Sequence, residues 1–270
     1  MRILMICPQF RPLTGGYERA AERLSAALAA RGHAVTVIAE RRDQSWPRLE
    51  EFSGFRIRRL RCIYRRGLHI ATSLGSFAFW LLRHGRAFRV WHVHQYGAHA
   101  TLAVLLGAVL RRPVVLKLAS SGPQGLAAAL ATAWLPRLQR WAHRRVDACV
   151  ALTVETREEA VEFGIPVDRV HEIGNAVDTD TFTTASSAER EALRARLGLP
   201  HGSVVVCVAR LAEEKNPLGL VDACALARHR LAAPWAVVLV GDGPLRPDIE
   251  KRVRALQLQD CIILVGEQSN

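Results

Sequence analysis

Two cations that could hold a diphosphate lie close together in the C-terminal third of the sequence. Arg210 and Lys215 follow the apolar run 203–209, and a helical pattern begins directly after them. Arginine offers a planar fork of N–H donors and lysine a point charge, so the pair suits an anionic diphosphate. The alternative is a solvated loop in which Glu213 and Glu214 neutralise the two cations.

Pairs of glycines mark two further turns between a strand and a helix. Gly15 and Gly16 precede the first long helical pattern, and Gly241 and Gly243 follow the apolar run 236–240. Glycine lets backbone N–H groups approach an anion, and a helix N-terminus adds unpaired donors. The first pair could contact a phosphate or a sugar, but taken alone it favours an ordinary turn between a strand and a helix. The second pair by itself indicates a tight turn.

Other polar side chains stand where they could face an acceptor. Glu18 lies in the first helical turn after Gly16, although it could instead pair with a neighbouring arginine or face solvent. His94 ends the apolar run 90–94, and we expect only one of His92 and His94 to point towards a given face. A hydrogen-bonded histidine at a strand end is the favoured interpretation of His94, and a contact to the cleft is the alternative. The candidates for an acceptor site or cleft are Glu18, His94, Lys117, Ser120 and Asn175.

No metal site is expected. The six cysteines include no pair separated by two residues, and most stand in apolar runs. This pattern indicates buried thiols in a reducing compartment, and neither a disulfide framework nor a zinc site.

Apolar runs of strand length alternate with helical patterns along most of the chain. The predicted strands are 2–7, 34–39, 55–60, 90–94, 113–118, 148–151, 170–173, 203–209, 236–240 and 261–265. The predicted helices are 17–31, 73–83, 98–110, 126–144, 153–163, 188–197, 217–230 and 245–256. Strands that alternate with helices predict parallel sheets covered on both faces, the doubly wound α/β arrangement.

This pattern predicts an α/β protein with two Rossmann-like, doubly wound domains, the second of them incomplete. The first spans 1–173, a linker without strand signals spans 174–200, and a partial domain spans 201–270. The partial domain has three predicted strands, whereas a doubly wound domain typically has about five or six.

Together these motifs resemble the family-4 retaining glycosyltransferases of the GT-B fold. The matching features are Gly15-Gly16, the Asn-x-Val-Asp-x-x-x-Phe stretch at 175–182, the Arg210 and Lys215 pair, and Gly-Asp-Gly-Pro-Leu-Arg at 241–246. The resemblance implies transfer of a sugar from a nucleotide-sugar donor with retention of configuration. It assigns catalysis to Arg210 and Lys215, which would stabilise the departing nucleotide. The donor-binding residues that it implies are Gly15, Gly16, Arg210, Lys215, Gly241 and Gly243. It implies no metal and no cofactor beyond the nucleotide-sugar co-substrate.

The sequence departs from the family pattern in two places. Relatives carry two glutamates separated by seven residues, and no pair in this sequence has that spacing. Many relatives also have a histidine where Ala119 stands. We therefore expect a fragment that lacks the C-terminal half of the donor domain and is catalytically incomplete.

Charge is distributed unevenly between the two parts of the chain. Residues 1–150 carry a net charge of +17, and the remainder carries −5. Arginines gather between Arg56 and Arg66, before an apolar stretch with Phe77, Phe79 and Trp80. One interpretation is a surface that binds anionic lipid. The other, equally weighted, is the wet face of an edge strand followed by a core helix.

These observations predict a glycosyltransferase of the hexosyltransferase type. Its acceptor would be a cell-envelope polysaccharide, a lipopolysaccharide or another lipid-linked glycan. A sugar-nucleotide epimerase of the same fold is one alternative, but no acid–base carboxylates were located for it. A non-catalytic, basic nucleic-acid-binding protein is the other, supported by charge alone, so no specific nucleic acid is predicted as a partner. Without a signal peptide or a long uncharged apolar run, we expect a cytoplasmic protein, with the inner membrane face as its peripheral location.

Overall fold

The computed structural model describes residues 1–13, 15–122, 125–131, 133, 135–228, 230 and 234–268. Contacts divide the chain into two compact units, Met1–Val177 and Asp178–Asn270. Asn175 therefore belongs to the first unit, and the helix at 187–197 belongs to the second.

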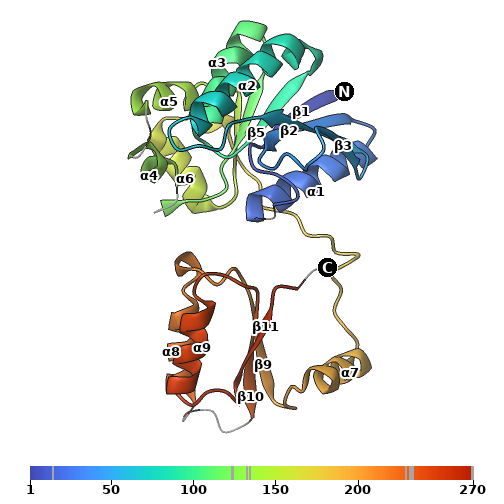
Figure 1. The fold of residues 1–270 in the computed structure, drawn as a ribbon, viewed down its shortest axis with the longest axis vertical. Helices are drawn as coiled ribbons and strands as arrows, with labels where there is room; N and C mark the ends of the chain where they lie inside the picture. Colours follow the sequence, from blue (N-terminus) through green and yellow to red (C-terminus); the bar gives the residue numbers. More distant parts are fainter. Residues whose placement is uncertain are drawn as a thin grey trace. The chain divides into compact units, whose positions relative to one another are not determined.

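The first unit is built on an eight-stranded sheet with the order β3-β4-β2-β1-β5-β6-β7-β8 (Figure 1). Its strands are β1 (Arg2–Ile6), β2 (Ala34–Arg41), β3 (Leu49–Phe52), β4 (Phe55–Arg61), β5 (Val90–His94), β6 (Val114–Lys117), β7 (Ala148–Ala151) and β8 (Val170–Glu172). Neighbouring strands are parallel, except that β3 and β4 form an antiparallel hairpin.

Helices cover both faces of this sheet. They are α1 (Gly16–Ala30), α2 (His69–His84), α3 (Ala98–Leu110), α4 (Leu126–Ala131), α5 (Pro136–His143) and α6 (Val154–Phe163). Alternate residues of β1 enter two different cores. Ile3 and Met5 pack on the side of α1, and Leu4 and Ile6 pack on the side of α2 and α3. The strand is apolar throughout because a parallel strand is buried on both faces.

The order in which successive strands are added to the sheet reverses at β1. From β1 the chain builds outwards through β2 and β4, and then returns to the other side of β1 through β5. Doubly wound sheets bind their ligands in the crevice at the carboxyl ends of the strands beside such a switch point. The carboxyl ends of β1 and β5 lead to two of the predicted sites, the Gly15-Gly16 turn and His94.

The second unit has a three-stranded parallel sheet with the order β11-β10-β9. Its strands are β9 (Ser203–Val208), β10 (Trp235–Val240) and β11 (Ile262–Gly266), and its helices are α7 (Ser187–Leu197), α8 (Pro217–Ala227) and α9 (Arg246–Ala255). Helices α8 and α9 pack together on one face of the sheet (Figure 1). Strand β9 lies at an edge and leaves Val205 and Val208 exposed.

The predicted doubly wound α/β class is confirmed, and the structure corrects the prediction in three places. The hairpin strand β3 was missed, because two glutamates interrupt its apolar pattern. The helix predicted at 126–144 is two helices, and Pro136 stands in the first turn of the second. The wet-edge interpretation of β4 is wrong, because β4 pairs with strands on both sides and Arg59 is 3% exposed.

Arg59 is buried with a full set of partners. Its guanidinium lies 2.7 Å from the Glu50 carboxylate and donates to the carbonyl oxygens of Arg11 and Pro47. Buried arginines are tolerated where such partners satisfy the charge. Within the described part of the chain, no helix is both long and apolar enough to cross a bilayer.

Candidate functional site

The two predicted diphosphate-binding cations are presented by the loop that follows β9. Arg210 comes two residues after the strand, and Lys215 ends the short 3₁₀ helix Glu213–Lys215. Both residues are exposed, and among the described residues neither forms an ion pair. No ion pair with Glu213 or Glu214 is observed among the described residues, although the exposure of this loop is also what the solvated-loop alternative predicts. The cations remain available to an anion at the carboxyl edge of the sheet.

Backbone hydrogen bonds hold this loop against the turn between β10 and α9. The Leu211 amide donates to the Asp242 carbonyl, and the Leu245 amide donates to the Leu211 carbonyl, each at 3.0 Å. The Ala209 amide likewise donates to the Val240 carbonyl at 3.0 Å. Arg210 therefore extends from a backbone that is fixed on both sides of it.

The two glycines of the β10–α9 turn are needed for this contact. Gly241 has a φ of +140°, and a Cβ atom there would lie 2.0 Å from the Ala209 carbonyl oxygen. A Cβ atom on Gly243 would lie 2.4 Å from the Leu211 carbonyl oxygen. Both distances are impossible for a real side chain, so glycine permits the close approach of the two backbones. This explains the glycines structurally and leaves their predicted donor contact a prediction.

At the N-terminus of α1, Gly16 has open space beside it and the Glu18 side chain is buried. No atom lies within 4 Å of the position that a Cβ atom on Gly16 would occupy, whereas one on Gly15 would lie 2.4 Å from Glu18 Oε2. Glu18 is 2% exposed, and neither carboxylate oxygen has a hydrogen-bond partner among the described residues. The interpretation of Glu18 as paired with a neighbouring arginine or exposed to solvent is therefore wrong. Glu22 pairs with Arg11 at 3.0 Å.

His92 and His94 share one face of β5, so the expectation that they diverge is wrong. Residues two apart on a strand point the same way. The two rings stack with their centroids 4.5 Å apart. His94 is 1% exposed and, within the described residues, neither of its ring nitrogens is hydrogen-bonded. Burial first, and then the neighbouring His92 and Lys117, lower the pKa of His94 well below its ordinary value.

Two of the predicted acceptor residues meet directly. Lys117 Nζ, at the end of β6, donates to Asn175 Oδ1 at 2.7 Å. Lys117 is 8% exposed, and its burial lowers the pKa of its ammonium group. Ser120 follows on the same loop, with its Oγ 3.4 Å from the Tyr96 hydroxyl. The first unit thus gathers Lys117, Asn175 and Ser120 beyond the carboxyl ends of neighbouring strands.

The predicted residues fall into two groups, one in each unit. Gly15, Gly16, Glu18, His94, Lys117, Ser120 and Asn175 belong to the first, and Arg210, Lys215, Gly241 and Gly243 to the second. Sequence reasoning missed Glu40, which is 3% exposed at the end of β2 and surrounded by polar side chains. The available signal was a glutamate that directly follows the apolar run 34–39.

Comparison with protein families gives matches along nearly the whole chain. Residues 14–181 match the family model described as Glycosyltransferase Family 4. Residues 189–270 match the model described as Glycosyl transferases group 1. The two matches divide the sequence close to the boundary between the compact units.

Two curated relatives illustrate the range of the similarity. The alpha-D-kanosaminyltransferase of Streptomyces kanamyceticus is 30% identical over 76% of this chain and 56% of its own length. The GDP-mannose-dependent alpha-(1-6)-phosphatidylinositol monomannoside mannosyltransferase of Mycolicibacterium smegmatis is 29% identical over 97% of this chain and 66% of its own length. The chain thus matches less than two thirds of the length of either relative.

Solved structures show the same fold. The Anabaena protein HepE, solved in complex with UDP-glucose, superposes with a TM-score of 0.74 at 16% identity, over all of this chain and 70% of its own. WaaG, a glycosyltransferase involved in lipopolysaccharide biosynthesis, gives a TM-score of 0.71 at 15% identity, over 99% of this chain and 70% of its own. Family match, sequence relatives and fold agree: the chain belongs to glycosyltransferase family 4 and has the GT-B fold.

Proposed function

We propose that this chain forms part of a retaining glycosyltransferase that moves a sugar from a nucleotide-sugar donor to a cell-envelope glycan or lipid-linked acceptor. The observation that carries the proposal is the pair of exposed cations, Arg210 and Lys215, which form no ion pair with any described residue and lie on a loop fixed by backbone hydrogen bonds. Family membership favours sugar transfer over the epimerase and nucleic-acid-binding alternatives. The name of the mannosyltransferase relative, which includes a lipid acceptor, is consistent with this acceptor class.

In this proposal the second unit binds the donor. The Arg210 guanidinium would donate two parallel N–H hydrogen bonds to the diphosphate oxygens, and the Lys215 ammonium would add a second positive charge. As the bond between sugar and phosphate breaks, negative charge develops on the leaving diphosphate, and preorganised cations stabilise that charge. Two fixed cations supply what a divalent metal supplies in other transferases, so we propose that transfer needs no metal.

The first unit would bind the acceptor. Glu18, His94, Lys117, Ser120 and Asn175 are its candidate contacts, and the +17 charge of residues 1–150 favours an acceptor that carries a negative charge. The two ring nitrogens of a neutral His94 have no hydrogen-bond partner among the described residues, so one could donate a hydrogen bond to a sugar hydroxyl and the other could accept one from it. The Gly16 backbone, which has open space beside it, would contact the donor's phosphate or sugar.

A peripheral location at the inner membrane face is the finer part of the proposal. Arg59 and Phe77 are buried and cannot contribute, but Arg65, Arg66 and Phe79 are exposed, Phe79 at 71%. Basic residues beside an exposed aromatic ring favour an anionic bilayer, by about 1 kcal/mol for each basic residue near the surface. Co-sedimentation with phosphatidylglycerol vesicles should fall in Phe79→Ser and in Arg65→Gln. Equal sedimentation of these variants and the parent would contradict the membrane part alone.

The transferase proposal is tested by donor binding and by transfer. The product of the complete reading frame is first screened by thermal shift against UDP-, GDP-, ADP- and TDP-sugars, and it is then assayed for nucleotide release and for a glycosylated product. We expect one nucleotide class to raise the melting temperature and to support transfer. A protein that binds none of the donors, or that interconverts sugar nucleotides without an acceptor, would contradict the proposal.

A further inference from the structure

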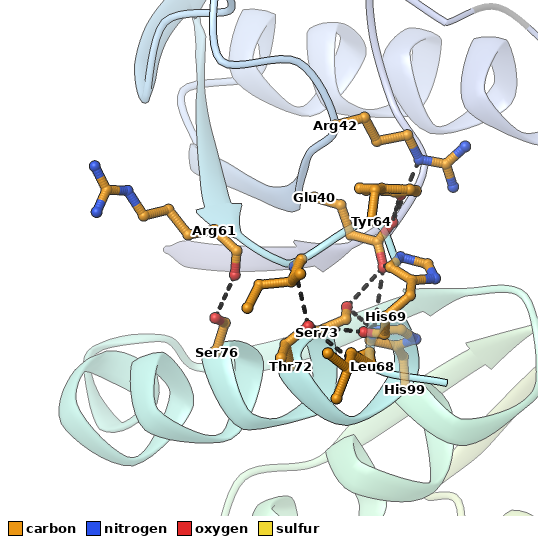
Figure 2. A network of polar contacts seen from close by, with 11 residues as sticks. Glu40, Arg42, Arg61, Tyr64, Leu68, His69, Thr72, Ser73, Ser76 and His99 are labelled. Atoms are coloured by element: carbon orange, nitrogen blue, oxygen red, sulfur yellow. Dashed lines mark hydrogen bonds and ion pairs between the residues drawn. The ribbon is translucent and has the colours of Figure 1, made fainter. Parts of the chain in front are cut away.

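A buried carboxylate organises the polar side chains beyond the ends of β2 and β4. Glu40 Oε1 accepts a hydrogen bond from Ser73 Oγ at 2.6 Å and lies 3.1 Å from His69 Nε2. Glu40 Oε2 accepts from the Tyr64 hydroxyl and lies 3.3 Å from Arg42 Nε. Figure 2 shows these side chains converging on Glu40 from the β2 end, the segment before α2, and α2 itself.

A thiol completes a set of metal-binding groups at this place. One ligand atom each from Glu40, Cys62 and His69 lies within 4.8 Å of the other two. Carboxylate, thiolate and imidazole are the three side-chain groups that bind Zn²⁺ in proteins. Their combination of hard and soft donors suits Zn²⁺ better than Mg²⁺ or Ca²⁺, which prefer oxygen alone.

We propose that Glu40, Cys62 and His69 bind one Zn²⁺ ion, with water in the fourth position. Tetrahedral coordination with bonds of about 2.0–2.3 Å places the ligand atoms about 3.5 Å apart. The present separations are all within 4.8 Å, so they would shorten by up to about 1 Å, whereas His69 Nε2 and Glu40 Oε1 are already 3.1 Å apart. Cys62 and His69 lie at or between the ends of β4 and α2, where the chain can adjust more readily than within the sheet. The inference depends on the first unit's geometry and not on the proposed transferase function. It differs from the sequence-based expectation that the cysteines form no zinc site, and the experiment below decides between the two.

Binding rearranges protons without any change of oxidation state. Zinc binds Nε2 of the neutral His69 imidazole, whose single proton is then on Nδ1, and it binds Glu40 as the carboxylate. The Cys62 thiol loses its proton to water as the Zn–S bond forms. One ion therefore binds with release of one proton from the cysteine, and the metal remains divalent.

Neighbouring side chains would support the ligands and limit the affinity. Ser73 would keep its hydrogen bond to the ligating Glu40, and hydrogen-bonded outer partners of this kind tune metal affinity. His99 Nε2 lies 2.9 Å from Ser73 Oγ and would orient that hydroxyl. Arg42 acts in the opposite direction, because its positive charge lies beside Oε2 and repels a cation. An ion here would join the ends of β2 and β4 to the start of α2.

The test uses the untagged 270-residue chain, stripped of metal by chelator and then titrated with Co²⁺. We expect a thiolate-to-cobalt charge-transfer band that saturates at one equivalent and is abolished by one equivalent of Zn²⁺, which binds such sites more tightly. Cys62→Ser should lose the band, and Ser73→Ala should weaken binding by about 10–100-fold. Cys261→Ser removes another half-buried cysteine, in the second unit, and should leave the titration unchanged.

Several results would overturn the zinc site. These are the absence of a charge-transfer band at one equivalent, a band that persists in Cys62→Ser, or a band that is lost in Cys261→Ser. If Cys62→Ser proves unfolded by circular dichroism, His69→Gln replaces it as the test variant. Zn²⁺ should raise the melting temperature of the parent and not that of folded His69→Gln, and equal shifts would reject the proposal.

Discussion

Lys117 and Asn175, 58 residues apart in the sequence, are joined by a hydrogen bond of 2.7 Å from the lysine Nζ to the amide oxygen. The bond links the end of β6 to the segment that leaves β8 towards the second unit. Both residues were candidates for the acceptor site, and the structure gives each of them a structural partner as well.

Removing the amide should therefore destabilise the first unit. In Asn175→Ala the buried ammonium of Lys117 loses its partner, and we expect the free energy of unfolding to fall by about 1–3 kcal/mol. Lys117→Met removes both the charge and the need for a partner and should cost less. Urea unfolding at pH 7 measures both values. An Asn175→Ala variant as stable as the parent would show that the bond contributes nothing.

The diphosphate assignment predicts loss of activity without loss of stability. Arg210→Ala and Lys215→Ala in the complete protein should each lower the rate of transfer by about 100-fold or more, because each removes charge stabilisation from the leaving group. Both side chains are exposed, so unfolding free energies should change by about 0.5 kcal/mol at most. Lys251→Ala, an exposed cation on α9, is the matched control. Activity within a few-fold of the parent would reject the assignment.

Substitution of a glycine in the β10–α9 turn should, in contrast, lower the stability of the second unit. A Cβ atom in Gly243→Ala would meet the Leu211 carbonyl at 2.4 Å, so the loop that carries Arg210 must move. We expect the free energy of unfolding to fall by about 2 kcal/mol or more, together with weaker nucleotide binding. Gly75→Ala in α2 has open space around the new methyl group and should stabilise by about 0.5–1 kcal/mol. Similar stabilities for the two variants would contradict the close approach.

Much of the fold could be predicted because single stretches of sequence determine it. The apolar runs of β1 and β2 and the helix before Gly32 follow periodicities of two and of 3.6 residues. Strand β3 could not, since Leu49–Phe52 is half acidic and becomes a strand only through pairing with β4. The Ser53-Gly54 turn, where both residues have positive φ, was the available hairpin signal.

The candidate site was less predictable, because burial depends on contacts between distant segments. Nothing near Glu18 in the sequence indicates that its carboxylate is covered. The close approach of Gly243 to Leu211 joins two loops that lie 32 positions apart. Strand geometry alone, in contrast, should have placed His92 and His94 on one face, although we expected them to diverge.

Buried histidines predict a loss of stability in mild acid. His143 is 1% exposed, and burial lowers its pKa to about 4, although a hydrogen bond with the Gly97 carbonyl opposes the shift. The unfolded chain takes up the proton at about pH 6.5. Between these values the unfolded state binds more protons, so stability falls as the pH falls, by about 1.4 kcal/mol per unit for this histidine.

A variant isolates that contribution. His143→Gln should reduce the pH dependence of the unfolding free energy between pH 6.5 and 4 by about this slope, whereas His171→Gln, at an exposed position on β8, should leave it unchanged. Urea unfolding curves at several pH values in this window provide the measurement. Identical slopes for parent and His143→Gln would show that His143 titrates normally in the folded protein.

The edge strand of the second unit predicts how the chain associates. Val206 and Val208 of β9 are 58% and 75% exposed on a strand whose outer edge has no partner among the described residues. Exposed apolar edges of this kind pair with other chains, and a lysine on the edge prevents such pairing. Val206→Lys should therefore reduce self-association in light scattering and change the free energy of unfolding by less than about 1 kcal/mol. Val237→Lys, placed in the covered strand β10 where the valine is 4% exposed, should unfold the unit instead. If Val206→Lys were as damaging as Val237→Lys, the valine face of β9 would have to be covered in solution, and the edge would not be the surface through which copies associate.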